Sequence, residues 1–172
     1  MDNHEIDPEE ARATAKIVGL SAIKYGDLSN QASKDYVFDL DRFTSFEGNT
    51  GPYILSTIVR IKSILNKYQQ AGNSLEGISI HKAANDSEKA LMLEVSRFNS
   101  VMENAFEEIA PHKICSYIYD LANAFNHFYH ETKILSEEDQ AQKESFLQLL
   151  QLTRRVLETS IDLLGFSAPD RM

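Results

Sequence analysis

Residues 52–68 read PYILSTIVRIKSILNKY, and this stretch decides the fold class. Its large apolar residues recur at spacings of four, three, four and three; they are Ile54, Ile58, Ile61, Leu65 and Tyr68. Such a period places side chains on one face of a helix. Pro52 suits the first turn of that helix and Gly72 suits its end. The stretch therefore predicts an amphipathic helix that packs its apolar face against other helices.

Similar helix signals occur along the rest of the chain. A first helix is expected from Pro8 to about Tyr25, with Asp7 as N-cap, Glu10 closing a capping box and Gly26 ending it. Later helices are expected to begin at Asp86 or Ser87, at Val101 after a break near Asn99 and Ser100, at Pro111, and after Ser136 as N-cap, the last one ending at Gly165. The sequence predicts an all-α helical bundle.

A short segment before the central helix has a different pattern. Tyr36, Phe38 and Leu40 alternate with Asp39 and Asp41, as in a half-buried strand or extended segment. No partner strand is evident in the chain. The expected architecture is therefore a helical bundle with a short extended N-terminal segment.

Length and composition set the protein class. The chain has 172 residues, 42% hydrophobic and 25% charged, which suits one globular domain or one domain with a short appendage. No apolar run is long enough to span a bilayer, and the acidic N-terminus is unlike a signal peptide. The single cysteine, Cys115, favours a reducing compartment. We expect a soluble, cytoplasmic protein without a membrane partner.

The net charge of the whole chain counts against nucleic-acid binding. Lys and Arg number 17 against 26 Asp and Glu, which gives a net charge of −9. Between Glu47 and Glu76, however, there is no acidic residue, while Arg60, Lys62 and Lys67 fall in that window. One basic helix face could therefore meet a polyanion, although an ordinary solvated helix face has the same pattern.

The sequence holds no recognisable catalytic motif. It lacks a Walker A loop, a dinucleotide-binding glycine motif, a Cys/His metal spacing and a nucleophile elbow. His127, His130 and Glu131 share one predicted helix but lack the pattern of di-iron bundles, so we expect a surface pair. Cys115 is expected in the core. We predict no catalytic residue and no metal site in this chain.

A polar stripe follows the central helix. Its members recur at spacings of three, four, three and four; they are Tyr53, Ser56, Arg60, Ser63 and Lys67. An exposed aromatic ring stacks on an unpaired base, and arginine stacks or reaches phosphate, as in the recognition of single-stranded RNA loops. The stripe is either such a surface or a plain solvent-exposed face, and spacing alone does not separate the two.

Several blocks of the sequence, in order, resemble one known family. They are Ala15–Leu28, Phe38–Asp41, Ser45–Thr50, Pro52 and Tyr53, Arg60 and Ile61, Pro111 and His112, Tyr117–Leu121, Phe128 and Tyr129, and Leu163–Pro169 with Met172. Over nearly the whole chain these blocks resemble arginyl-tRNA synthetase, a class I aminoacyl-tRNA synthetase. The bundle resembles its DALR-type anticodon-binding domain. The block ending at Thr50 and the ending at Met172 are the most specific.

The resemblance implies a C-terminal fragment of a longer enzyme, arginine–tRNA ligase. Residues 1–47 would be the end of the catalytic region and its stem, and residues 48–172 the α-helical anticodon-binding domain. ATP and arginine would bind the missing upstream domain, so this fragment would hold no cofactor and be inactive alone. The implied partners are the anticodon loop of tRNA-Arg and that upstream catalytic domain, and no DNA is expected.

The resemblance also suggests site residues. Tyr53 and Arg60 match family positions that face the anticodon loop, and the terminal Met172 matches a residue near the anticodon. The Phe128-Tyr129 block matches an anticodon-side helix end, although core and rim positions are an equal alternative. With Lys67 from the polar stripe, the predicted RNA-binding residues are Tyr53, Arg60, Lys67, Tyr129 and Met172. The family often has a second tyrosine where this chain has Ser56, and its match at Gly48 and Asn49 is expected to shape a turn.

Two other interpretations remain open from the sequence. One is a helical protein–protein adaptor that uses the Tyr53 and Arg60 face, because partner surfaces are also rich in Tyr and Arg. The other is the same bundle from a related class I synthetase, against which the Leu163–Met172 ending argues.

Overall fold

A computed structural model describes residues 7–172. Its helices are α1 (Pro8–Leu28), α2 (Leu40–Thr44), α3 (Gly51–Gln70), α4 (Asp86–Ser96), α5 (Phe98–Glu107), α6 (Pro111–Glu131), a short 3-10 helix (Ile134–Ser136) and α7 (Gln140–Leu163). No strand occurs within residues 7–172, so the predicted all-α fold is confirmed. No helix of this range combines the length and the apolar character that a membrane crossing requires.

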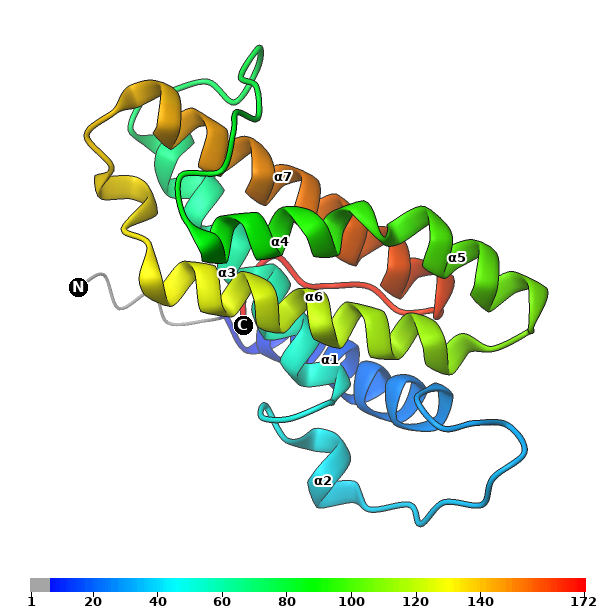
Figure 1. The fold of residues 1–172 in the computed structure, drawn as a ribbon. Coiled ribbons are helices and arrows are strands. Elements are labelled where there is room, and N and C mark those ends of the chain that lie inside the picture. The colour runs from blue at the N-terminus through cyan, green and yellow to red at the C-terminus, as the bar shows by residue number, and fades with distance from the viewer. Residues whose placement is uncertain (1–6) are drawn as a thin grey trace.

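The bundle packs around α3. This helix contacts α1, α6 and α7, and its predicted apolar stripe from Ile54 to Tyr68 is buried. Figure 1 shows α4 and α5 nearly end to end beside α6, and α2 with its flanking loops set to one side of the bundle. The corresponding stripe of α6, which includes Ile118, Phe125 and Phe128, faces the same core. One core therefore joins helices from both halves of the chain.

Glycines set the distances between the first three helices. Gly51 opens α3 directly against the Ser21 carbonyl of α1, where a Cβ atom would collide with the backbone. Gly26 lies under the Phe43 ring of α2, at 2.5 Å from an ideal Cβ position to Phe43 Cδ2. The expected end of α1 at Gly26 is therefore wrong. The helix continues to Leu28, and the glycine at position 26 instead allows the close packing of the Phe43 ring.

Several predicted caps are displaced by a few residues. The Asp7 side chain caps nothing, and Glu10 instead pairs with Arg171. The break between α4 and α5 falls at Arg97, before the predicted position. Asn85 caps α4 through the Glu88 amide, and Asp139 caps α7 in place of Ser136. The displaced caps of α4 and α7 lie near other residues that are also able to cap a helix.

The predicted strand is replaced by irregular chain and a short helix. Residues 31–39 have no regular secondary structure and are exposed, which corrects the expected half-burial. Asp39 accepts a hydrogen bond from the Arg42 amide (3.1 Å) and thereby caps α2. Tyr36 and Phe38 pack their rings on Phe43 with centroids 6.1 and 5.1 Å away. A strand needs a neighbour, and no strand in the described part of the chain supplies one.

Candidate nucleic-acid interface

Tyr53 lies where the first turn of α3 meets α6. Its ring is half-buried, and its hydroxyl donates a hydrogen bond to Asn123 Oδ1 (2.7 Å). The same hydroxyl accepts a hydrogen bond from Asn126 Nδ2 (2.9 Å). The Tyr119 ring meets the Tyr53 ring at an angle of 61°, with centroids 5.7 Å apart. The phenol is therefore fixed at the seam between the two helices with part of its ring exposed.

Arg60 lies two turns further along α3 on the same face. Its Nη1 atom donates a hydrogen bond to Asn126 Oδ1 (2.5 Å). Its Cζ atom lies 5.4 Å from the centroid of the Tyr129 ring, a cation–π geometry. Tyr129 is 38% exposed and stacks on the buried Phe125, whereas its neighbour Phe128 lies in the core. The structure thus brings Tyr53, Arg60 and Tyr129 together on one surface, which we call the α3–α6 face.

The other two predicted site residues lie apart from these contacts. Lys67 is exposed near the end of α3 and forms no ion pair with any residue of the described range. Met172 is half-buried against the core at the end of the C-terminal segment. Both residues therefore stay predictions as RNA contacts.

The basic window of the sequence contains one cation with a structural role. Lys62 bonds Glu158 and Asp170, each at 3.2 Å, and donates a hydrogen bond to the Pro169 carbonyl (3.1 Å). It thereby fastens the C-terminal segment to α3 and α7. Of the three cations in that window, only Arg60 and Lys67 lack a carboxylate partner among residues 7–172.

The turn before α3 has a structural role, as expected. Gly48 adopts a φ of 78°, and the Thr50 hydroxyl caps α3 by accepting a hydrogen bond from the Tyr53 amide (3.2 Å). Asn49 Oδ1 accepts a hydrogen bond from the Tyr25 hydroxyl (2.5 Å), which ties this turn to α1. The turn therefore fixes the start of α3 and, with it, the position of the Tyr53 side chain.

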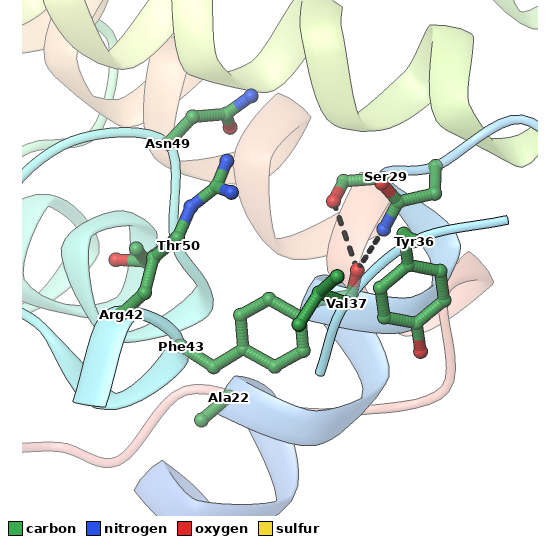
Figure 2. Close-up of a pocket in the computed structure, with 10 residues that line it drawn as sticks. Ala22, Ser29, Tyr36, Val37, Arg42, Phe43, Asn49 and Thr50 are labelled. Carbon is green, nitrogen blue, oxygen red and sulfur yellow. Dashed lines mark hydrogen bonds between the residues drawn. The ribbon is translucent and has the colours of Figure 1, made fainter. Parts of the chain in front are cut away.

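A small polar pocket of about 250 Å³ lies beside this turn (Figure 2). Arg42 and Asn49 line one side, and Ser29 and Tyr36 line the other. Ser29 and Asn30 both donate side-chain hydrogen bonds to the Gly26 carbonyl, at 3.1 and 2.6 Å. None of the predicted RNA-binding residues lines this pocket.

The remaining candidates have ordinary structural environments. His127 faces Glu131 across one helical turn at 3.5 Å, and the His130 ring contacts Tyr129. No cluster of three potential metal ligands occurs in residues 7–172. Cys115 is fully buried, as predicted, and burial raises the pKa of its thiol to about 12.

Apart from Tyr129, sequence reasoning missed the residues that α6 contributes to the face. Tyr119, Asn123 and Asn126 recur at spacings of four and three, and Tyr129 follows three residues later. That period places them on one face of α6. This spacing was visible in the sequence. Only the packing of α6 on α3 shows that this side of α6 meets the polar stripe that begins at Tyr53.

Similar proteins point to one family. The family model described as "DALR anticodon binding domain" matches residues 54–172. The arginine–tRNA ligase of Agathobacter rectalis is 64% identical over 99% of the chain, and that of Alkaliphilus oremlandii is 54% identical over all of it. The chain spans 29% of the length of each of these two relatives.

Solved structures agree with this relationship. The arginyl-tRNA synthetase of Thermus thermophilus superposes with a TM-score of 0.87 at 34% identity, over 99% of this chain and 29% of that one. The enzyme of Plasmodium falciparum gives a TM-score of 0.77 at 29% identity, over 89% of this chain and 27% of that one. With a family model that covers most of its length, the chain belongs to the DALR anticodon-binding domain family.

Proposed function

We propose that the chain is the anticodon-binding part of an arginine–tRNA ligase and that it positions tRNA-Arg for arginylation by an upstream catalytic domain. Membership of the DALR family and the names of its relatives support this assignment. The observation that carries the RNA contact is the α3–α6 face. It presents Tyr53, Arg60 and Tyr129 together, with both tyrosine rings and the guanidinium partly exposed.

The chemistry of this face suits unpaired bases. Aromatic rings stack on bases of any sequence, and arginine adds stacking and hydrogen bonds to phosphate or base edges. One guanidinium N–H of Arg60 is bonded to Asn126, which leaves further donors for a ligand. Tyr119 lies against Tyr53 and offers an additional ring where the family tyrosine is replaced by Ser56. Lys67 and Met172 would extend the contact.

The catalytic steps would belong to the part of the enzyme that this chain does not span. ATP and arginine would bind there, and the chain alone would be catalytically inactive. The whole enzyme would work in the cytoplasm. Residues 1–47 would form the stem toward that part. The exposed apolar side chains of Val37, Phe38, Leu40 and Phe46 support a covering partner, since a cluster of this kind is unusual on a free surface.

A titration with RNA tests the proposal. The 172-residue chain is mixed with the anticodon stem-loop of tRNA-Arg at about 50 mM salt, where phosphate contacts are strong. A second stem-loop keeps the stem and replaces the anticodon nucleotides. We expect saturable binding of the first and weaker binding of the second. Equal binding of both, or no binding of either, would contradict the assignment. Retention of a protein partner without RNA binding would favour the adaptor interpretation.

A further inference from the structure

Asn126 connects two of the three side chains that the α3–α6 face presents, Arg60 and Tyr53. Its Oδ1 atom accepts a hydrogen bond from Arg60 Nη1 at 2.5 Å. Its Nδ2 atom donates to the Tyr53 hydroxyl at 2.9 Å and to Thr57 Oγ1 at 3.2 Å. Thr57 is fully buried, and its hydroxyl also contacts the Tyr53 carbonyl at 3.1 Å. A single side chain on α6 is therefore bonded to three residues of α3.

The amide has only one orientation that satisfies these contacts. A guanidinium group only donates hydrogen bonds, so the oxygen of Asn126 must face Arg60. The nitrogen then faces Tyr53 and Thr57, and both of its hydrogens have an acceptor. Rotating the amide by half a turn would set its nitrogen against the Arg60 guanidinium, donor against donor. The Tyr53 and Thr57 hydroxyls would then have to give up their own acceptors, Asn123 Oδ1 and the Tyr53 carbonyl, to donate to the amide oxygen.

Arg60 has no carboxylate partner in the described residues. Its position over the Tyr129 ring depends on the cation–π contact and on the hydrogen bond to Asn126. A free arginine side chain carries large rotamer entropy, and holding it in advance lowers the cost of binding a ligand.

We infer that Asn126 is the positioning residue of this face: it holds the Arg60 guanidinium on Tyr129 and the Tyr53 phenol beside it before RNA binds. The inference rests on the proposed RNA contact. Asn126 acts through Arg60 and Tyr53, because both of its amide hydrogens and its oxygen are already bonded within the protein. An acidic protein thereby keeps one guanidinium ready for a polyanion.

A double-mutant cycle tests this role. We measure the affinity of the wild-type chain, Asn126→Ala, Arg60→Ala and the double variant for the tRNA-Arg anticodon stem-loop. Asn126→Ala is expected to weaken binding about fivefold and Arg60→Ala about tenfold, within the range of single stacking contacts. Because part of the effect of Asn126 passes through Arg60, the double variant should be weaker than Arg60→Ala by clearly less than the about fivefold loss of Asn126→Ala alone, and the remaining loss reflects Tyr53. Fully additive losses would overturn the inference, as would unchanged affinity of Asn126→Ala.

Asn123 offers a matched control on the same helix. It accepts a hydrogen bond from the Tyr53 hydroxyl and has no contact with Arg60. Asn123→Ala should therefore lose less affinity, and its loss should add to that of Arg60→Ala. A loss that is coupled to Arg60 as strongly as that of Asn126→Ala would contradict the special role of Asn126.

NMR of the free chain separates this inference from the proposed function. Asn126→Ala should let the Arg60 guanidinium signals broaden and exchange faster, because their acceptor is gone. Asn126→Asp keeps an acceptor at that position and should preserve them. Unchanged signals in Asn126→Ala would overturn the positioning role even if RNA binds. If the wild-type chain fails to bind the stem-loop, the proposed function falls, and these signals still decide whether Asn126 holds Arg60.

Discussion

The guanidinium of Arg60 on α3 lies over the Tyr129 ring of α6, with its Cζ atom 5.4 Å from the ring centroid. The contact joins the two helices at the surface, outside the buried core. It also places a positive charge on an aromatic side chain that stays 38% exposed. Charge and ring are therefore presented to solvent together, which is the combination that single-stranded RNA binding uses.

Tyr129 should contribute through its ring more than through its hydroxyl. Tyr129→Phe keeps the cation–π contact with Arg60 and should bind the anticodon stem-loop within about twofold of wild type. Tyr129→Ala removes both the contact and a stacking surface and should weaken binding at least about fivefold. Fluorescence anisotropy with a labelled stem-loop measures both. Wild-type affinity in Tyr129→Ala would exclude this ring from the interface.

Lys67 should contribute charge without sequence preference. It is exposed and unpaired within the described range, so its ammonium group is available for a phosphate contact. Lys67→Gln should lower the slope of log K against log salt by about 0.7, the value for one phosphate contact to a single strand. The loss should be the same for stem-loops of different loop sequence. An unchanged slope would remove Lys67 from the predicted site.

The sequence predicted the helices best where apolar residues recur with the helix period and form a buried face. The stripe from Ile54 to Tyr68 needs only the helix period and an apolar core, and it is buried as expected. The caps were less certain, because Asn85 and Asp86, or Ser136 and Asp139, are alternatives that only the tertiary structure decides. Alternation alone does not make a strand, because pairing supplies its hydrogen bonds, and residues 31–39 have no pairing strand in residues 7–172.

Residue spacing alone predicted the candidate site on one helix only, while Tyr129 of α6 was predicted from the family resemblance. Tyr53 and Arg60 share a face of α3 by spacing, and the structure places them on the same surface. Asn126 was missed because a half-buried asparagine is unremarkable until its neighbours are known. Its three contacts all lie on another helix, and residue spacing within α6 contains no information about them.

Two glycines of α1 should respond oppositely to alanine. An added Cβ at Gly19 meets no atom within 4 Å, so Gly19→Ala should stabilise the helix by about 0.5–1 kcal/mol. At Gly26 the Phe43 ring would have to move, and Gly26→Ala should cost about 1–3 kcal/mol. Urea unfolding of both variants measures the difference. Equal effects would contradict the packing of α2 on α1.

Glu88 should make stability depend on pH. Its Oε2 atom accepts a hydrogen bond from the Ala84 amide (2.6 Å), while the buried Oε1 has no partner in the described structure. Burial raises the pKa of Glu88, and the bond from Ala84 partly offsets this. The folded state therefore binds the proton more tightly than the unfolded state. Protonated Glu88 therefore contributes to the free energy of unfolding. This contribution is fully present below the pKa that Glu88 has in the unfolded state, and it is lost as the pH rises through the pKa that it has in the folded state.

Glu88→Gln removes the charge and keeps an acceptor for Ala84. We expect this variant to exceed wild type in free energy of unfolding by about 1 kcal/mol at pH 7, the lower range for one unpartnered buried group. The difference should shrink near pH 4. Glu103→Gln, an exposed substitution, serves as the control and should be close to neutral at both values. Equal free energies of unfolding for Glu88→Gln and wild type at pH 7 would contradict this account.

The most direct test of the RNA interface compares two cations of α3. Arg60 belongs to the α3–α6 face, whereas Lys62 is bonded to Glu158, Asp170 and the Pro169 carbonyl. We measure the affinity of Arg60→Ala and Lys62→Ala for the tRNA-Arg anticodon stem-loop at about 50 mM salt. Arg60→Ala should weaken binding about tenfold. Lys62→Ala should lose clearly less, because Lys62 acts only by fastening the segment that carries Met172. Equal losses in both variants, or wild-type affinity in Arg60→Ala, would contradict the assignment of this face.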